Sequence, residues 1–377
     1  MMATDQDLHE DTPSYVDFSA LEYQPQFAAN CIGLTPRRLM DIERDYDIEI
    51  RRVARGTVSA RMYTPSDIFR ISALRRELGH AKRLARQVVV SIFVQKGGTA
   101  KTTTAVNLGI AAQFSGLKTL IIDNDPQGDT SSMLGYDPDL APEDLKNFGI
   151  PLDRLVDGHL GNLIAPHLQM RSFEAKSLDQ VVKKPFGEYG PHLIPADAYM
   201  EDLVIALDVS PNPDMRYAKW IQLAISGKIL GCDLSDYDLI IFDNAPAGSR
   251  LTKNSVAASD LLLCPVRMDK FSSRALVRLN DWCARFAEEY NFAPDMLAIP
   301  TMFFKGRTAL QENLARLNSL FPNRVTEEKI YFSEDYSKSL NNGVPLLLWK
   351  GASTKSLDPA RKVFEEVIAK IRDIGSH

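Results

Sequence analysis

From residue 88 onward, short apolar runs alternate with segments in which apolar residues recur at helical spacing. The runs have strand length and are rich in β-branched residues, and they cover residues 88–94, 119–123, 192–195, 238–243, 260–266 and 296–304. Strands that are apolar at nearly every position are typical of a parallel sheet with both faces covered. The pattern therefore predicts an α/β fold with a mostly parallel twisted sheet and helices on both faces.

Residues 21–86 show a different pattern, in which short helices surround a hairpin. Two helices are predicted, each with a threonine cap followed by proline in its first position, and the caps are Thr35 and Thr64. Between these helices, β-branched residues flank Gly56 as they do in a β-hairpin. A linker helix is expected over residues 72–87. This order of helices and hairpin is that of a winged helix-turn-helix.

These patterns divide the chain into three parts. Residues 1–20 are acidic and poor in large apolar side chains, so a flexible N-terminus is expected. A winged helix-turn-helix domain follows at 21–86, and the α/β domain covers 87–377. Within it, residues 136–190 carry prolines and mixed polarity, and we expect helices and loops inserted on the sheet.

Charge is unevenly distributed along the chain. The 377 residues carry a net charge of −5, and 45% apolar with 25% charged residues is ordinary soluble composition. Residues 31–86, however, contain 13 Lys and Arg against 7 Asp and Glu. This basic segment could face DNA, although a basic run is also common on a merely solvated surface.

Cysteine, histidine and hydropathy patterns exclude several classes of protein. The four cysteines include no C-x-x-C pair, and the six histidines show no metal-ligand spacing, so a zinc site is not expected. No apolar run approaches the length of a membrane span, and the N-terminus does not resemble a signal peptide. These features predict a cytoplasmic protein.

The strongest chemical signal follows the first predicted strand. A glycine-containing turn with two lysines leads into a predicted helix, the arrangement in which backbone N–H groups and the helix dipole bind phosphate. The predicted phosphate-binding residues are Gln95, Lys96, Gly97, Gly98, Thr99, Ala100, Lys101, Thr102 and Thr103. The fit to the G-x-x-x-x-G-K-[ST] pattern is imperfect, because Gln95 and Ala100 stand where glycines belong.

Carboxylates follow two other predicted strands. Asp123 and Asp125 lie at the end of the second strand, and Asp243 lies at the end of another. Ligands of open α/β sheets bind beyond the carboxyl ends of the strands, so these carboxylates are expected to converge on the phosphates. The sequence thus predicts a phosphate-binding site with carboxylates beside it.

Four segments of the chain resemble, in order, the deviant Walker A, the switch I, the Walker B and the following segment of the ParA partition ATPases. They are "QKGGTAKTTTAVNL", "LIIDNDPQGDTSSMLG", "YDLIIFDNAPAG" and "LLLCPVRMDKFSSRAL". The ParA ATPases belong to the MinD/ParA branch of the P-loop NTPases. The chain departs from the family at Ala100, usually glycine, and at "NAPAG", which takes the place of the family's usual switch II sequence. Alanine is harmless at position 100 if its φ is negative, because only a left-handed conformation penalises Cβ.

The resemblance implies ATP and Mg²⁺ as cofactors and assigns a role to each site residue. Lys101 would hold the β- and γ-phosphates, and Thr102 would ligate Mg²⁺. Asp243 would act on the ligands of the metal, Asp123 would support them, and Asp125 would position the attacking water. Lys96 would reach the nucleotide of a second subunit, so that ATP controls formation of a homodimer. The implied partners are nucleoid DNA and a ParB-type centromere-binding protein that stimulates hydrolysis.

Residues 31–86 resemble a MerR-like DNA-binding head through "TPRRLMDIE" and "ARMYTPSDIFRI", and the whole chain resembles the larger plasmid-type ParA proteins, which bind their own operator. A small docking or dimerisation domain is the alternative. The resemblance places DNA-binding arginines on a recognition helix and near a wing, at Arg37, Arg38, Arg51, Arg52, Arg55 and Arg61. Candidates for non-specific DNA binding in the ATPase part are Arg267, Lys270, Arg274, Arg278, Lys305 and Arg307.

Two other functions remain open from the sequence. The first is a MinD-like membrane ATPase, since residues 361–375 present an apolar stripe at helical spacing, although such a stripe is more often packed in a core. Its members are Val363, Phe364, Val367, Ile368 and Ile371. The second is a transcriptional repressor that only senses nucleotide, in which a partner would not stimulate hydrolysis.

Overall fold

The computed structural model describes residues 15–55, 58–165, 173–268 and 272–376. Six parallel strands form the central sheet in the order β5-β4-β6-β3-β7-β8. Their bounds are β3 Val88–Ile92, β4 Thr119–Asn124, β5 His192–Ile194, β6 Leu239–Asn244, β7 Leu261–Arg267 and β8 Asp295–Thr301. The predicted α/β fold with a parallel sheet is confirmed, and each predicted strand agrees with an observed one to within three residues at either end.

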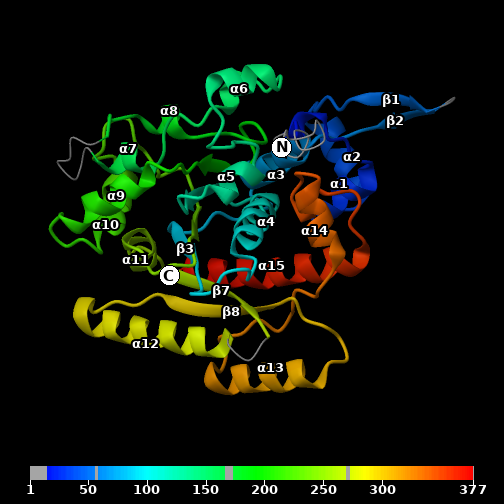
Figure 1. Cartoon of the computed structure of the whole chain (residues 1–377). Coiled ribbons are helices and arrows are strands. Elements are labelled where there is room, and N and C mark those ends of the chain that lie inside the picture. The colour runs from blue at the N-terminus through cyan, green and yellow to red at the C-terminus, as the bar shows by residue number, and fades with distance from the viewer. Residues whose placement is uncertain (1–14, 56–57, 166–172, 269–271, 377) are drawn as a thin grey trace, which may run out of the picture.

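Alternation along each strand divides the core between the two faces of the sheet. In β3, Val88 and Val90 pack on one face, against α4 Lys101–Phe114 and α15 Thr354–Ile374, whereas Val89 packs on the other. Short helices cover that second face beside β4 and β6: α7 Leu160–Ile164, α8 Leu178–Val181, α9 Met200–Asp208, α10 Arg216–Ile225 and α11 Arg250–Ala257. Beside β7 and β8 the cover is α12 Ser272–Tyr290 and α13 Thr308–Leu320. In Figure 1, the helices α12 and α13 are seen below strand β8 of this sheet.

Helix α4 lies close against the sheet because it carries glycine where it crosses β4. A Cβ added at Gly109 would lie 2.6 Å from Ile121 Cδ1, so a larger residue would require either the Ile121 side chain or the helix to move. Eleven of the fourteen residues of α4 are buried. The position of its N-terminus, which carries the lysine of the loop, is therefore tightly determined.

The packing of helix α15 decides whether its apolar stripe faces a membrane or the protein core. Val363, Val367 and Ile371 are fully buried, and Phe364 and Ile368 are at most 7% exposed. The stripe packs in the same core as α4 and η4 Leu346–Leu348. It is core packing, as such stripes usually are, and offers no apolar face to a lipid surface. Among the described residues, no helix is long and apolar enough to cross a membrane.

The N-terminal part consists of α1 Pro25–Cys31, α2 Pro36–Asp45, the antiparallel strands β1 Arg52–Arg55 and β2 Val58–Arg61, and α3 Pro65–Glu77. Both threonine caps are observed. The Thr35 side chain accepts from the N–H of Arg38, and Thr64 forms a reciprocal capping box with Asp67.

Helix α3 joins the N-terminal part to the C-terminal end of α4. Ser72 Oγ donates to the carbonyls of Gln113 and Phe114, at 3.0 and 2.8 Å. The Phe69 ring stacks on Phe114 with centroids 4.7 Å apart, and Arg76 forms a 2.7 Å ion pair with Asp238. The two parts share one hydrophobic core.

Two expectations for this part are wrong. The linker helix is absent from residues 80–87, because α3 ends at Glu77 and Gly79 turns the chain with φ +74°. Residues 15–20 are also not loosely attached: Phe18, in η1 Phe18–Ala20, is 1% exposed, with its ring 4.6 Å from that of Phe186. Burial of one large aromatic side chain is enough to hold this segment. Residues 1–14 lie outside the described part of the chain.

The segment expected to be an insertion does contain short helices and loops, among them α6 Pro142–Asn147 and η2 Leu152–Arg154. The remaining helices are α5 Asp129–Met133, which follows β4, and α14 Glu334–Asn341, which precedes η4.

Candidate functional site

The predicted phosphate loop joins β3 to α4. Gln95, Gly97 and Gly98 are exposed, whereas Thr99 is buried, with its Oγ1 3.4 Å from the carbonyl oxygen of Lys96. Gly98 has φ +65°, a left-handed conformation that glycine adopts without strain. The exposed side of the loop thus lies beside the first N–H groups of α4, which have no partner within the helix, and such N–H groups are what an anion site requires.

Ala100 does not meet the condition under which alanine would be harmless. Its φ of +69° and ψ of +34° place it in the left-handed region, immediately before the first residue of α4. The backbone, rather than the side chain, accounts for this conformation, because the Ala100 carbonyl accepts from the N–H and the hydroxyl of Thr104, at 2.9 and 2.7 Å. The loop therefore carries a strained residue beside its lysine.

Lys101 begins α4 with its ammonium directed back over the loop. The residue is 8% exposed, and its Nζ lies 3.4 Å from the carbonyl oxygen of Lys96. Burial lowers the pKa of Lys101, and the carboxylates of Asp243, Asp125 and Asp129 oppose that shift. A largely buried cation at the mouth of an anion site is positioned to bind phosphate oxygens.

Asp243, at the end of β6, connects the loop to the next segment. Its Oδ2 accepts 2.8 Å hydrogen bonds from the hydroxyls of Thr102 and Thr130. Its Oδ1 is buried and has no hydrogen-bond partner in the described part of the protein. Burial raises the pKa of Asp243 to about 6, although the two hydroxyls favour the charged form.

Asp123 lies beside Asp243, at the end of the neighbouring strand. Its Oδ2 accepts from the N–H and the hydroxyl of Ser131, at 2.8 and 2.7 Å. Burial, and then the charge of Asp243, raise the pKa of Asp123 to about 8. Two adjacent buried carboxyl groups and an orphaned carboxylate oxygen fit a site that a divalent cation would neutralise.

The described residues contain no group of three or more His, Cys, Asp or Glu side chains that could hold a metal ion. A cation here would need the Thr102 hydroxyl, water and phosphate oxygens, which is how Mg²⁺ is commonly held beside nucleotides. Thr102 is half-buried and already points at Asp243. The residues present therefore fit Mg²⁺ bound together with a nucleotide.

Asp125 follows β4 on the exposed side of this pair. It is half-buried, and its Oδ1 accepts from the N–H of Gln127 at 3.1 Å. Asp129 begins α5 close by, and burial, and then the charge of Asp125, raise its pKa. The structure thus brings the predicted carboxylates Asp123, Asp125 and Asp243 to one side of Lys101.

Four residues of the site were not identified from the sequence: Thr130, Ser131, Asn124 and Asn244. Thr130 and Ser131 hold the two aspartates, as described above. Asn124 Nδ2 donates to Asn244 Oδ1 at 2.7 Å, and Asn244 Nδ2 donates to the carbonyl of Ile92 at 3.2 Å. The sequence positions of these residues could have identified them. Each asparagine directly follows a predicted site aspartate, and Thr130 and Ser131 directly follow "DPQGD".

The predicted DNA-binding arginines of the N-terminal part differ in their surroundings. Arg37 and Arg38 are exposed on α2, and Arg52 is exposed on β1. Arg51 pairs with Glu22. Arg61 pairs at 2.9 Å with Glu43, which is 6% exposed and also accepts from Tyr63, so its guanidinium is held within the protein. The Arg55 side chain lies outside the described part.

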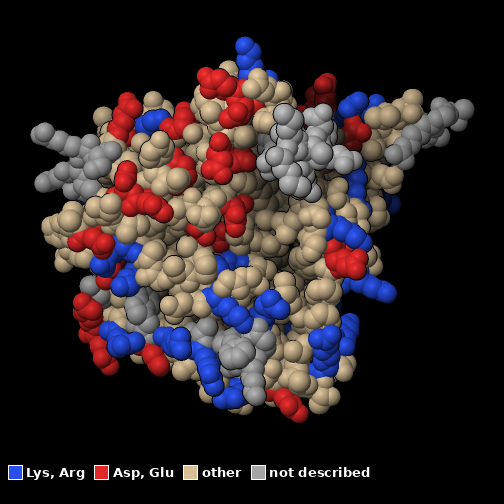
Figure 2. Space-filling model, in the orientation of Figure 1, with Lys and Arg blue, Asp and Glu red and all other residues tan. Residues whose placement is uncertain are grey.

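A second group of basic residues lies at the β7–β8 edge of the sheet. Arg267, Arg274, Arg278, Lys305 and Arg307 are exposed, and Lys270 lies outside the described residues. The Lys305 ammonium lies 4.6 Å from the Tyr331 ring, and the Arg307 guanidinium lies 4.1 Å from the Phe304 ring. On the face in Figure 2, Lys and Arg are frequent in the lower part, where α12 and α13 lie, and acidic residues in the upper part.

Comparisons with known proteins agree with this geometry. A family model described as an AAA domain matches residues 87–295. The chromosome partitioning protein ParA of Caulobacter vibrioides is 28% identical over 290 residues, which cover 76% of this chain and 95% of that protein.

Two solved structures show the same fold. A structure titled "Partition Protein" aligns with a TM-score of 0.59 at 16% identity and covers 96% of this chain and 94% of its own. Cobyrinic acid a,c-diamide synthase from Mycobacterium smegmatis, solved with ADP and magnesium, aligns with a TM-score of 0.52 at 19% identity, covering 69% and 91%. With the loop, the strand-end aspartates and the family match in the same region, the chain belongs to the ParA family of partition P-loop ATPases.

Proposed function

We propose that this protein is a DNA-partition ATPase that hydrolyses ATP slowly and uses nucleotide binding to control its assembly on DNA. The observation that carries the proposal is the contact of the Thr102 hydroxyl with Asp243 beside the buried ammonium of Lys101. These groups come from two places in the chain, the start of α4 and the end of β6, and together supply what a nucleoside triphosphate and its metal need. The relative from C. vibrioides, described as a chromosome partitioning protein, supports the same role.

Lys101 binds the β- and γ-phosphates of ATP, and the N–H groups at the start of α4 bind the remaining phosphate oxygens. Thr102 would hold Mg²⁺, which would neutralise charge on the phosphates. Asp243 orients the Thr102 hydroxyl by accepting a hydrogen bond from it. Asp123 supports this arrangement through Ser131. Phosphoryl transfer needs positioning and charge neutralisation more than covalent participation of the protein, so this set is sufficient for slow turnover.

Asp125 orients the attacking water. It is the least buried of the three strand-end aspartates, and it lies on the side of the site that faces solvent. Its backbone is held by the turn in which Gly128 N–H donates to the Asp125 carbonyl at 2.9 Å. A carboxylate in a defined turn can hold a water without itself being a metal ligand.

Lys96 acts across a two-fold axis on the nucleotide of a second subunit. It is partly exposed on the opposite lip of the loop from Lys101, and its carbonyl lies toward the Lys101 ammonium. Two ammonium groups at one γ-phosphate of the same subunit would repel each other, so the second lysine is better used in trans. ATP then joins two subunits into a homodimer.

DNA contacts two separate surfaces. Arg37, Arg38 and Arg52 on the N-terminal part bind the protein's own operator, which makes the protein an autorepressor. The exposed basic residues at the β7–β8 edge bind nucleoid DNA without sequence preference in the ATP-bound dimer. A ParB-type centromere-binding protein stimulates hydrolysis and releases the dimer, so the protein is cytoplasmic and nucleoid-associated.

The ATPase rate measured with DNA alone, with the partner alone and with both tests the proposal. Stimulation by the partner, larger when DNA is present, is expected. A nucleotide-sensing repressor would show operator binding but no stimulation, and that result would replace the partition function with the repressor function. The buried stripe of α15 removes the observation that favoured a membrane-binding ATPase.

A further inference from the structure

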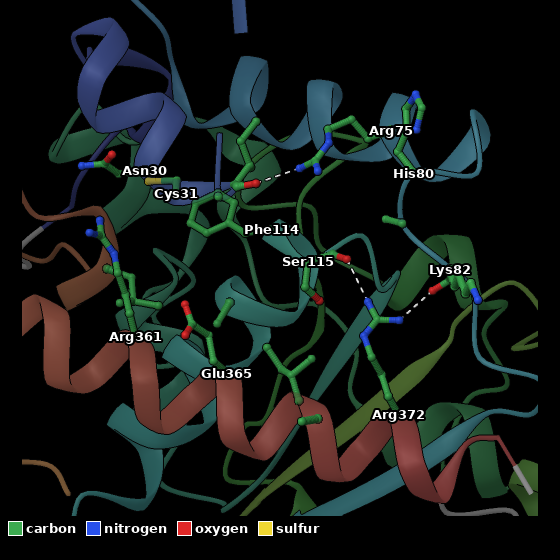
Figure 3. Close-up of a pocket in the computed structure, with 17 residues that line it drawn as sticks. Asn30, Cys31, Arg75, His80, Lys82, Phe114, Ser115, Arg361, Glu365 and Arg372 are labelled. Atoms are coloured by element: carbon green, nitrogen blue, oxygen red, sulfur yellow. Dashed lines mark hydrogen bonds between the residues drawn. The ribbon is translucent and has the colours of Figure 1, made fainter. Parts of the chain in front are cut away.

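A pocket of about 570 Å³ lies between the N-terminal part and the α/β part, at the C-terminal end of α4 (Figure 3). Its walls come from the end of α1 and the turn after it, from α3 with the residues that follow it, and from α15. Phe114 and Ser115 border it at the end of α4, whereas Lys101 begins the same 14-residue helix. A helix of that length spans ~21 Å, so the pocket is separate from the phosphate loop.

The charged side chains around this pocket are mostly basic. Arg75, Lys82, Arg361 and Arg372 line it, with His80, against the single carboxylate of Glu365. In Figure 3, Arg361 and Glu365 lie near one end of the drawn part of α15, and Arg372 and Lys82 lie near the other. The end of the pocket that contains Arg372 is therefore the more positive one.

Arg75 and Arg372 are half-buried cations without a carboxylate partner within ion-pairing distance in the described part of the chain. Arg75 donates to the Ile32 carbonyl at 2.7 Å, and Arg372 donates to the carbonyls of Lys82 and Ser115 at 2.7 and 2.9 Å. Burial lowers the pKa of both guanidinium groups; the charge of Arg38 adds to this shift at Arg75, whereas the charge of Asp238 partly opposes it at Arg372. The neighbouring Arg76, by contrast, is paired with Asp238. A partly desolvated cation that lacks a counter-ion is costly, and a bound anion would offset that cost.

Apolar side chains complete the pocket. Phe114, Ile368 and Leu347 are each at most 7% exposed and border the space between the basic groups. The volume falls in the range of sites that hold small organic molecules, which are usually lined by apolar groups with a few polar groups that orient the ligand.

We propose that this pocket binds a small organic anion, an apolar body that carries a phosphate or carboxylate head group. The head group lies between Arg75 and Arg372, away from Glu365, and the apolar body lies against Phe114 and Ile368. Arg75 has further N–H donors beyond the one bound to Ile32, and an anion would accept them in charge-assisted hydrogen bonds. Because the walls come from both parts of the chain, the ligand stabilises their contact by an amount that grows with the logarithm of the ligand concentration above its Kd.

Calorimetric titration of the full chain with phenyl phosphate tests the site. Inorganic phosphate, which has only the head group, and phenol, which has only the body, are the comparison probes. Phenyl phosphate is expected to bind more tightly than either. The Lys101→Ala variant must also bind phenyl phosphate with unchanged affinity, because that substitution changes the phosphate loop and leaves the pocket intact.

Two variants locate the binding. Arg75→Met removes the guanidinium and should weaken phenyl phosphate binding about tenfold or more, and Arg75→Lys should restore part of it. Ala369→Trp adds bulk from an exposed position of α15 that lines the pocket, so it should block binding without disturbing the core. Arg70→Met on the exposed side of α3 and Ala315→Trp on α13 are the matched controls and should bind normally.

Each outcome decides the proposal. Absence of phenyl phosphate binding would overturn it, and so would normal binding in Ala369→Trp. Binding that is lost in Lys101→Ala but kept in Ala369→Trp would place the probe at the phosphate loop instead. If Arg75→Met does not fold, the comparison of Ala369→Trp with Ala315→Trp still decides.

Discussion

Replacing Ala100 with glycine should stabilise this protein, although alanine to glycine is normally a destabilising change. Ala100 has φ +69° at the residue before α4. A left-handed conformation costs a non-glycine residue about 1–2 kcal/mol, and glycine avoids that cost. Glycine also increases the conformational entropy of the unfolded chain, which lowers the free energy of unfolding by about 0.4–1 kcal/mol. The expected net stabilisation is therefore about 0.5–1 kcal/mol.

Two control variants make the sign of this effect interpretable. Ala105→Gly changes a buried alanine in the interior of the same helix and should destabilise by about 1 kcal/mol or more. Gly98→Ala forces alanine into φ +65°, where nothing lies within 4 Å of the added Cβ, so its cost of about 1 kcal/mol would be conformational alone.

Urea unfolding followed by circular dichroism measures these differences, and thermal unfolding provides a second measurement. For a chain of this length, 1 kcal/mol corresponds to about 1 °C in Tm, and the m value is also large, so the shifts are small in both measurements and the variants are compared side by side under identical conditions. Destabilisation of Ala100→Gly by as much as Ala105→Gly would refute the reasoning, because it would mean that Ala100 has a negative φ in solution.

The remaining predictions concern the proposed site, the proposed DNA-binding surface and one buried histidine, His192. Lys101→Ala should lose nucleotide binding, because the phosphates lose their buried counter-charge; unchanged affinity for a fluorescent ATP analogue would contradict the assignment. Lys96→Ala should keep much of its ATP affinity but fail to form the ATP-dependent dimer, and sedimentation with ATP would falsify this by showing a normal dimer. Arg37→Ala combined with Arg38→Ala should abolish operator-specific gel shifts at fixed salt while ATP-dependent binding to random duplex continues; equal loss on both duplexes would indicate one shared surface. Burial lowers the pKa of His192, whose Nδ1 lies 2.8 Å from the Tyr237 hydroxyl, so the unfolded chain binds the proton more tightly. Stability should therefore decrease as pH falls below about 6.5, and His192→Gln should reduce the slope; an unchanged slope would show that other groups account for it.

The positions of the strands and helix starts were determined by short-range sequence signals. Six apolar runs became the six strands of the sheet, and Thr35 and Thr64 cap the helices that they were expected to cap. These features depend on residues within about four positions of each other, so a linear pattern contains them. The loop, its lysine and the strand-end aspartates were visible for the same reason.

The connections inside the site depend on tertiary structure. Thr102 and Asp243 are 141 residues apart in the chain, and Thr130 and Asp243 are 113 apart. Which hydroxyls meet this carboxylate depends on the strand order, which places β6 between β4 and β3, and no local pattern encodes that order. Thr130 was therefore missed even though Asp243 was identified.

The conformation of Ala100, the docking of the N-terminal part and the burial of Phe18 also do not follow from the preferences of the residues themselves. Ala100 is held left-handed by the turn between β3 and α4, against its own preference. Ser72, in the middle of α3, donates to carbonyls at the end of α4 that are 41 and 42 residues away in the chain. Phe18 is buried by Phe186, far along the chain. For the N-terminal part and Phe18, long-range packing outweighs a weak local preference, because a local preference is worth about 1 kcal/mol and burial of a large side chain is worth more.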